Sequence, residues 1–146
     1  MGMTSQNPVD LVRHFLTGLA TGDVDGALED VDDAIVYTNV SLPTVRGKAK
    51  FGAIMRGLGR PGLGFDVQFL AINAADDGVV LTERIDELAV GPVRIRFWVC
   101  GRFEVREGRI TVWRDYFDFF DVTKGLVRAV LGVVAPPLNR KIDGVG

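Results

Sequence analysis

Residues Val79 to Phe117 read "VVLTERIDELAVGPVRIRFWVCGRFEVREGRITVWRDYF", and this stretch decides the fold. Apolar and polar residues alternate along three runs, which are separated by the short turn sequences AVGP and REG. Alternation with a period of two is typical of strands with one buried face, and short turns that contain glycine join antiparallel neighbours. The stretch therefore predicts three antiparallel strands, at residues 79–88, 93–105 and 109–120.

The residues before this stretch add a strand and supply helices. The segment FDVQFLAIN at residues 65–73 also alternates, and NAADDG turns the chain after it, so the predicted meander has four strands. Apolar residues at helical spacing predict three earlier helices, at Val9–Ala20, Val24–Val31 and Lys48–Leu58. Helices followed by antiparallel strands indicate an α+β domain, with the helices packed on the concave side of one strongly curved, mainly antiparallel sheet.

The composition fits a single globular domain over residues 1–146. Hydrophobic residues make up 47% and charged residues 25%, and the formal net charge of -2 gives no electrostatic reason to expect a nucleic-acid partner. The first residues do not resemble a signal peptide, and no apolar run reaches the roughly 18 residues of a membrane span. A single cysteine cannot form an internal disulfide. We therefore expect a cytoplasmic protein with no membrane span.

The two ends of the chain differ in character. We expect residues 1–7 to be flexible, whereas residues 125–146 form an apolar C-terminal extension that begins GLVRAVLGVVAPPL. Arg128 and the prolines interrupt this extension. We expect it to cover the core or a dimer partner rather than to enter lipid, because it is too short for a span.

Several kinds of catalytic site are disfavoured because their reactive residues are scarce. One histidine and one cysteine are too few for a conventional zinc site, so we expect no metal. Neither Ser5 nor Ser41 lies in a G-x-S-x-G motif, and no phosphate-binding glycine motif occurs, so we expect no nucleotide cofactor. We expect His14 to be a solvated side chain and Cys100 an inert, buried thiol. Any chemistry must then come from carboxylates, arginine, tyrosine and amides.

Polar side chains in three separate segments share faces with one another. Arg84 and Asp86 lie two residues apart in the predicted strand LTERIDELAV, so they point to the same face, about 6.5 to 7 Å apart. Tyr37 and Asn39 share a face in the segment AIVYTNVSL. Asp115 shares its face with three aromatic residues, namely Trp113, Phe117 and Phe119. Spacing alone permits either a buried site or ordinary surface ion pairs, such as Asp115 with Arg114.

These segments resemble a known family. The motifs YTN at residues 37–39, ERID at 83–86 and WRDYFD at 113–118 are similar to those of the limonene-1,2-epoxide hydrolase family, in the same order and at similar separations. The resemblance extends from the first helix to Asp118. It implies a cone-like α+β fold of the cystatin or nuclear-transport-factor type with an internal pocket, and it implies a homodimer.

The resemblance also implies a role for each polar residue. Asp115 would be the general base that takes a proton from a water held by Tyr37 and Asn39. Asp86 would be the general acid that protonates the epoxide oxygen, and Arg84 would lie between the two carboxylates. The implied reaction adds water to a small apolar epoxide in one step to give a vicinal diol, without a covalent intermediate, a metal or a cofactor.

The same resemblance assigns the faces of the central strand, and a mostly apolar pocket is expected beside them. Arg84 and Asp86 would point into the cavity, and Glu83 and Glu87 would point to water. Six apolar residues are candidates for the walls of this pocket, although the spacing of each also fits an ordinary core residue: Leu42, Met55, Leu58, Trp113, Phe117 and Phe119. The compact turn in AVGPVRIRF and the apolar extension after Asp121 depart from the family, so limonene oxide itself is not assumed to be the substrate.

Two other functions remain open from the sequence. Related cones include ketosteroid isomerases and polyketide cyclases, in which an aspartate base works with acidic hydrogen-bond donors at an enolate oxygen. That reading gives Arg84 no clear role between two acids. The other alternative is a non-catalytic binder of small apolar molecules, because fold does not determine function.

Overall fold

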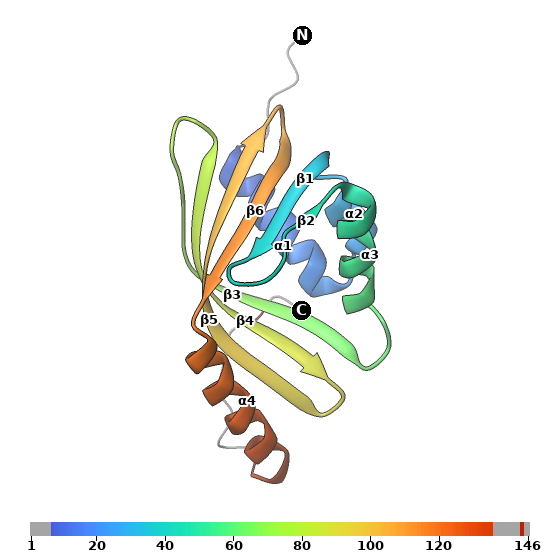
Figure 1. The fold of residues 1–146 in the computed structure, drawn as a ribbon, viewed down its shortest axis with the longest axis vertical. Helices are drawn as coiled ribbons and strands as arrows, with labels where there is room; N and C mark the ends of the chain where they lie inside the picture. The colour runs from blue at the N-terminus through green and yellow to red at the C-terminus, as the bar shows by residue number, and fades with distance from the viewer. Residues whose placement is uncertain (1–6, 136–143, 145–146) are drawn as a thin grey trace.

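The computed structural model describes residues 7–135 and residue 144, which form four helices and six strands (Figure 1). The helices are α1 Pro8–Thr21, α2 Val24–Leu28, α3 Lys48–Leu58 and α4 Phe119–Val134. The strands are β1 Val31–Asn39, β2 Val45–Arg46, β3 Leu63–Ala74, β4 Val79–Val90, β5 Val93–Arg106 and β6 Arg109–Phe117.

The six strands form one curved, unclosed sheet in the order β2-β1-β6-β5-β4-β3. Strands β3 to β6 are the predicted antiparallel meander, and only the β1–β6 pair among the described strands is parallel. The prediction of a single α+β domain with a strongly curved, mainly antiparallel sheet is therefore confirmed. The parallel pair has a consequence for the site, because it brings an early segment of the chain beside the last strand.

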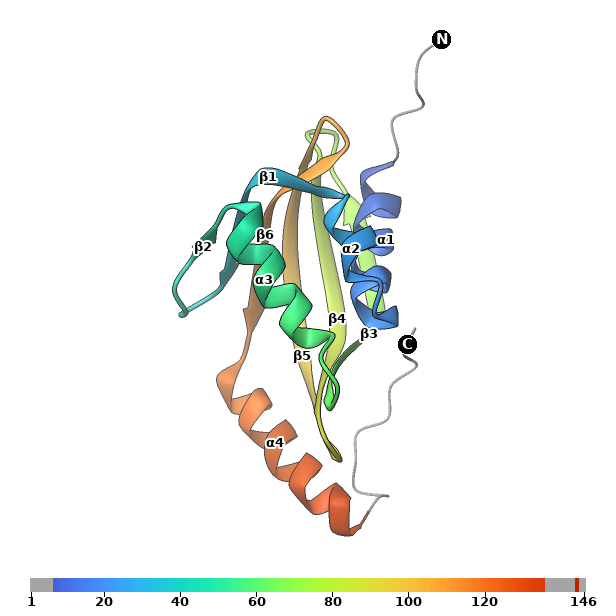
Figure 2. The same cartoon turned by 90° about the vertical axis from the view of Figure 1, so that its right-hand side faces the viewer.

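Helices α1, α2 and α3 cover the concave face of the sheet, as Figure 2 shows. The side chain of Asn7 accepts a hydrogen bond from the backbone N–H of Val9 and caps α1, and Gly22 ends this helix in the left-handed conformation. The apolar stripe of α1 is fully buried against the sheet: Leu11, Val12, Phe15, Leu16 and Leu19. Of the segment 1–7 that was expected to be flexible, the residues before Asn7 lie outside the described part.

The second predicted helix is shorter than its pattern indicated. Helix α2 ends at Leu28, whereas the sequence predicted a helix through Val31. The backbone carbonyl of Asp30 accepts a hydrogen bond from the N–H of Ile110 at 2.8 Å, and Val31 begins β1 with its side chain buried. The spacing of apolar residues favours a helix here, but pairing with the last strand determines the structure of these residues.

The last strand is also shorter than predicted, and the prediction that Phe119 lies on its face is wrong. Strand β6 ends at Phe117, and the side chain of Asp118 accepts a hydrogen bond from the backbone N–H of Phe120. This contact caps the start of α4, which contains Phe119. Polar and apolar residues still alternate in DYFDFF after the strand has ended. Asp118 fits this alternation, but it is also a favourable N-cap residue, and in the structure it starts the helix.

Helix α4 runs along one edge of β5 (Figures 1 and 2). Strand β6 ends opposite Val99, so the first half of β5 pairs, among the described strands, with β4 alone. The side chain of Asp121 accepts a hydrogen bond from the backbone N–H of Trp98 on this open edge. Gly125 lets the helix approach closely, because a Cβ at this position would lie 2.5 Å from the carbonyl oxygen of Arg96. In the described residues, no helix has the length and apolar character needed to cross a membrane.

The prediction that Glu87 points to water is wrong, as the convex face of β4 shows. Glu87 was expected to point to water, but only 4% of it is exposed. Its carboxylate forms ion pairs with Arg94, at 2.9 Å, and with Arg96. A buried carboxylate needs such partners, so the residue is part of the packed outer face of the sheet. The alternation of β4 was read correctly, but the residues that cover each face could not be read from it.

Candidate functional site

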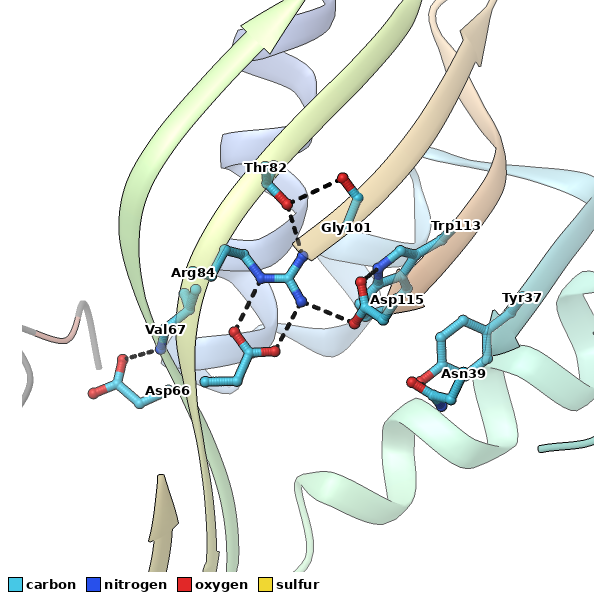
Figure 3. A network of polar contacts seen from close by, with 10 residues as sticks. Tyr37, Asn39, Asp66, Val67, Thr82, Arg84, Gly101, Trp113 and Asp115 are labelled. Carbon is cyan, nitrogen blue, oxygen red and sulfur yellow. Dashed lines mark hydrogen bonds and ion pairs between the residues drawn. The ribbon is translucent and has the colours of Figure 1, made fainter. Parts of the chain in front are cut away.

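A buried arginine on the concave face of β4 binds two carboxylates. The Arg84 side chain is 0% exposed, and its Nε and Nη2 donate to the two oxygens of Asp86 at 3.0 and 2.8 Å. Its Nη2 also donates to Oδ2 of Asp115 at 2.8 Å (Figure 3). Burial alone would lower the pKa of the Arg84 guanidinium, but the two carboxylates hold this pKa above its ordinary value. The guanidinium therefore stays charged and fixes both carboxylates.

Asp115 reaches this cluster from β6. Its Oδ1 accepts a hydrogen bond from Nε1 of Trp113 at 2.7 Å, so each of its oxygens has a donor. Burial raises the pKa of the Asp115 carboxyl above its ordinary value; the charge of Arg84 opposes this increase, and the charge of Asp86 adds to it. Two carboxylates that share one cation carry an excess negative charge, and a shared proton removes it. The pair can therefore hold a proton at a pH where an isolated aspartate would not.

Tyr37 and Asn39 lie beside this cluster on β1. In the parallel pair, Tyr37 is opposite Trp113 and Asn39 is opposite Asp115. Nδ2 of Asn39 donates to the phenol oxygen of Tyr37 at 2.9 Å, and Figure 3 shows this pair next to Trp113 and Asp115. Burial raises the pKa of Tyr37 to about 12, so the phenol keeps its proton near neutral pH. Since the phenol oxygen already accepts from Asn39, its O–H is available to donate to a molecule in the pocket.

The polar groups lie at one wall of a cavity of about 370 Å³. Tyr37, Asn39, Asp86 and Asp115 line it, while Arg84 lies behind them. The lining contains all six predicted wall residues: Leu42, Met55, Leu58, Trp113, Phe117 and Phe119. It also contains seven residues that the sequence did not indicate, namely Leu19, Ile54, Phe65, Leu88, Ile95, Phe97 and Val122. A mostly apolar cavity with a few convergent polar groups is typical of a site for a small apolar molecule.

Two residues that support the arginine were missed by sequence reasoning. Nη1 of Arg84 donates to Oγ1 of Thr82 at 3.0 Å. Gly101, the neighbour of Thr82 on β5, makes room for this arrangement: a Cβ there would lie 2.4 Å from Nη1 of Arg84 and 2.7 Å from Oδ1 of Asp115. Thr82 could have been found, because it shares the period of two with Arg84. Nothing in the sequence pattern around Gly101 indicates that it lies beside the arginine.

The two remaining reactive side chains lie outside the cavity. His14 contacts Asp30 on the surface, and this contact raises the pKa of the imidazole. Cys100, expected to be buried, is only half-buried; burial raises the pKa of its thiol, which makes it less reactive. In the part of the chain that the structure describes, no three His, Cys, Asp or Glu side chains are grouped to hold a metal ion.

Comparison with known proteins identifies the family. The chain matches the limonene-1,2-epoxide hydrolase catalytic domain over residues 6–128. It is 45% identical over 129 residues to the epoxide hydrolase EphG of Mycobacterium tuberculosis (strain ATCC 25618 / H37Rv), in an alignment that covers 88% of this chain and 85% of that protein. The chain belongs to the limonene-1,2-epoxide hydrolase family. It is an epoxide hydrolase of this type, and the resemblance inferred from the three sequence motifs is confirmed.

Solved structures agree with the family assignment. An LEH-like epoxide hydrolase from M. tuberculosis superposes with a TM-score of 0.89 at 39% identity, covering 97% of this chain and 100% of that one. A polyketide cyclase-like protein from Xanthomonas campestris pv. campestris has a TM-score of 0.68 at 20% identity, covering 84% of this chain and 99% of that one. The second likeness concerns the fold alone. Membership in the limonene-1,2-epoxide hydrolase family therefore favours the hydrolase over the cyclase interpretation, because the likeness to the cyclase concerns only the fold.

Proposed function

We propose that this epoxide hydrolase adds water to an apolar epoxide in one step, with Asp115 as general base and Asp86 as general acid. The observation that carries this proposal is the buried guanidinium of Arg84, which binds both carboxylates at 2.8 Å and so holds a base and an acid at fixed positions in one cavity. Tyr37 and Asn39 hold the attacking water beside Asp115, which lies opposite Asn39 in the sheet.

The reaction begins with one proton on the pair, carried by Asp86. The water oxygen attacks an epoxide carbon while Asp115 takes a proton from the water. The carbon–oxygen bond of the strained ring breaks, and Asp86 gives its proton to the leaving oxygen. The product is a vicinal diol, with Asp115 protonated and Asp86 ionised. Transfer of one proton from Asp115 back to Asp86, through solvent or directly, restores the starting state without a cofactor.

The raised pKa of Asp115 is compatible with its role as the base. A carboxylate with a raised pKa accepts a proton more readily, provided that the pH lies above this pKa. Arg84 stays charged throughout, so it balances whichever carboxylate is ionised at each stage. The hydrolysis therefore moves one proton within a cluster whose other charges do not change.

The shape of the cavity supports an apolar substrate. Most of its lining is aromatic or aliphatic, and the polar groups gather at the carboxylate pair. Helix α4 contributes Phe119 and Val122 to the apolar part of the lining. We expect the epoxide ring to lie against Asp86 and Asp115 and the apolar remainder to extend toward α4.

The test is a single-turnover reaction in water enriched with heavy oxygen, with a panel of alkyl, cyclic and steroid epoxides. We expect the diol of the first turnover to contain the label, because the water attacks directly. An unlabelled first-turnover diol would mean that an enzyme carboxylate attacks, and it would overturn the one-step scheme. The panel also shows which apolar skeleton the cavity accepts.

The sequence predicts a homodimer in the cytoplasm, and both the oligomeric state and the cellular location are part of this proposal. A homodimer is supported by the large apolar side chains that α4 leaves exposed, among them Phe120, Leu126, Val127, Val130, Leu131 and Val134. Light scattering after size-exclusion chromatography gives the mass in solution. A monomer across the micromolar range would count against the homodimer. The cytoplasmic location rests on the sequence alone.

A further inference from the structure

Trp113 lies between the aromatic core and the carboxylate pair. Its side chain is 3% exposed, and its Nε1 donates to Oδ1 of Asp115 at 2.7 Å. Four aromatic rings surround the indole, with centroid distances of 4.7 Å to Tyr37, 5.3 Å to Phe15, 5.5 Å to Phe103 and 6.1 Å to Phe51. The ring is therefore held in place, and its N–H cannot turn away from the carboxylate.

The hydrogen-bond donors to the two carboxylates are balanced only because of this indole. Asp86 receives two N–H groups, both from Arg84. Asp115 receives one N–H from Arg84, and the second comes from Trp113. Hydrogen bonds donated to a carboxylate favour its ionised form, and an indole N–H can only donate. Without the indole, Asp86 would have two donors and Asp115 one.

We propose that Trp113 is a positioning residue whose N–H, the second of two donors to Asp115, favours the ionised form of this carboxylate and so keeps it able to take a proton from the water. This inference rests on the proposed function, in which Asp115 is the base. If the indole N–H were absent, the ionised form of Asp115 would lose one of its two donors. Asp115 would then hold a proton more readily, and a protonated Asp115 could not take a proton from the water.

The other groups around Asp115 cannot replace this hydrogen bond. The titratable and charged groups that face it are Arg84 and Asp86 on β4 and Tyr37 on β1, while Cys100 of β5 lies on the outer face. The concave side of β5 contributes Gly101, which has no side chain, and α3 and α4 contribute apolar residues to the cavity. The hydrogen bond of Trp113 lowers the pKa of Asp115, against the raising effects of burial and of the Asp86 charge.

The test replaces the indole N–H and keeps the packing. Trp113→Phe removes the N–H together with one ring, and incorporation of 3-benzothienylalanine at position 113 removes the N–H while keeping both rings. Phe15→Leu is the matched control, because Phe15 contacts the Trp113 ring from α1 but lines no part of the cavity. The first measurement is a carbon-13 NMR titration of the aspartate carboxyl groups in the free enzyme, with Asp115 assigned from the Asp115→Asn spectrum.

We expect both Trp113 replacements to raise the pKa of Asp115 and to move the acidic limb of the kcat/KM profile to higher pH. We expect kcat near neutral pH to fall roughly tenfold to a hundredfold, the usual effect of losing one hydrogen bond to a charged group, with KM little changed. Phe15→Leu is expected to leave both the titration and the position of the limb unchanged.

The outcomes separate this inference from the proposed function. If the titration of Asp115 and the acidic limb do not move in the benzothienylalanine variant, Trp113 only packs and the inference is wrong. The same holds if Phe15→Leu moves them equally. If Asp86→Asn and Asp115→Asn both keep their activity, the proposed catalytic scheme fails, yet the NMR titration still reports whether the indole controls the proton.

Discussion

Strand β4 carries an ion cluster on each of its faces, each built around one buried charge, and the two clusters are built in opposite ways. On the concave face one arginine, Arg84, is shared by Asp86 and Asp115. On the convex face one carboxylate, Glu87, has a separate arginine for each of its oxygens, Arg94 and Arg96. Both clusters use the same two kinds of charged group. All three members of the concave cluster are buried, whereas on the convex face Glu87 is buried and Arg94 is 54% exposed.

The two clusters differ in their ratio of carboxylates to arginines. With both carboxylates ionised, the concave cluster has one more negative charge than it has cations, so a proton finds a place there. The convex cluster offers a cation to each oxygen of its carboxylate and borders no part of the cavity. We therefore expect the first cluster to do chemistry and the second to hold the sheet together.

The strongest test of this comparison removes one carboxylate from either face. We expect Asp86→Asn and Asp115→Asn each to lower kcat by about 10³-fold or more, because each removes a proton-transfer group. Glu87→Gln is the control, and its diol formation is expected to stay within a few-fold of that of the unmodified enzyme. Activity in either aspartate variant near the level of the Glu87→Gln enzyme would contradict the assignment of chemistry to the concave face.

The next test removes a cation and measures stability. Arg84→Met leaves two buried carboxylates without their cation, and we expect the free energy of unfolding to fall by about 3–5 kcal/mol. Arg94→Met is the matched variant; its side chain is 54% exposed and Glu87 keeps Arg96, so we expect a loss of about 1 kcal/mol or less. Urea denaturation of both variants gives the two values. Equal losses would show that the clusters do not differ in this way.

The space around the two clusters differs as well. Gly101→Ala adds a methyl group that would lie 2.4 Å from Nη1 of Arg84. We expect a loss of about 1–3 kcal/mol in unfolding free energy, typical of overpacking, together with a lower kcat because the guanidinium must move. Gly57→Ala on α3, where a Cβ has no neighbour within 4 Å, is the control: we expect kcat to stay unchanged and the unfolding free energy to rise by about 1 kcal/mol or less, because alanine favours a helix over glycine. An unchanged kcat in Gly101→Ala would show that the position of the guanidinium is not critical.

The smallest expected effect is a pH dependence of stability. Burial raises the folded-state pKa of Asp115 above the ordinary value of 3.8. The folded protein therefore binds this proton more tightly than the unfolded chain, and the resulting stabilisation is complete below pH 3.8 and lost as the pH rises through the raised pKa. Asp115→Asn cannot ionise and escapes this loss. We expect its stability relative to the unmodified enzyme to increase between pH 4 and pH 7, and a constant difference would contradict the raised pKa.

The sequence was most informative for elements in which apolar residues repeat with a single period along the whole element, as in the strands. Alternation predicted the four strands of the meander and placed Arg84 and Asp86 on one face of β4. It failed at Phe119, because Asp118 serves both as the end of an alternating run and as a helix cap. It also failed at Glu87, because a period of two distinguishes two faces of a strand but does not tell which side chains pack over each face.

Contacts between distant segments could not be predicted from spacing. Arg84 and Asp115 are 31 residues apart, and their contact depends on the order of β4, β5 and β6 in the sheet. The parallel β1–β6 pair, which sets Asn39 opposite Asp115, is equally invisible in the local pattern. The resemblance to the family motifs indicated that these residues belong to one site, but it gave no physical reason why the chain brings them together. The indole donor of Trp113 was missed because an aromatic residue in a strand is usually read as packing.

The position of α4 has a consequence for association of the enzyme with itself. An open strand edge offers unpaired N–H and carbonyl groups to the strands of other molecules, which makes it a starting point for aggregation. The first half of β5 has such an edge, and Asp121 takes up the N–H of Trp98 while Gly125 brings the helix directly onto the backbone of Arg96. The helix that lines one part of the pocket thus also shields the sheet from intermolecular strand pairing.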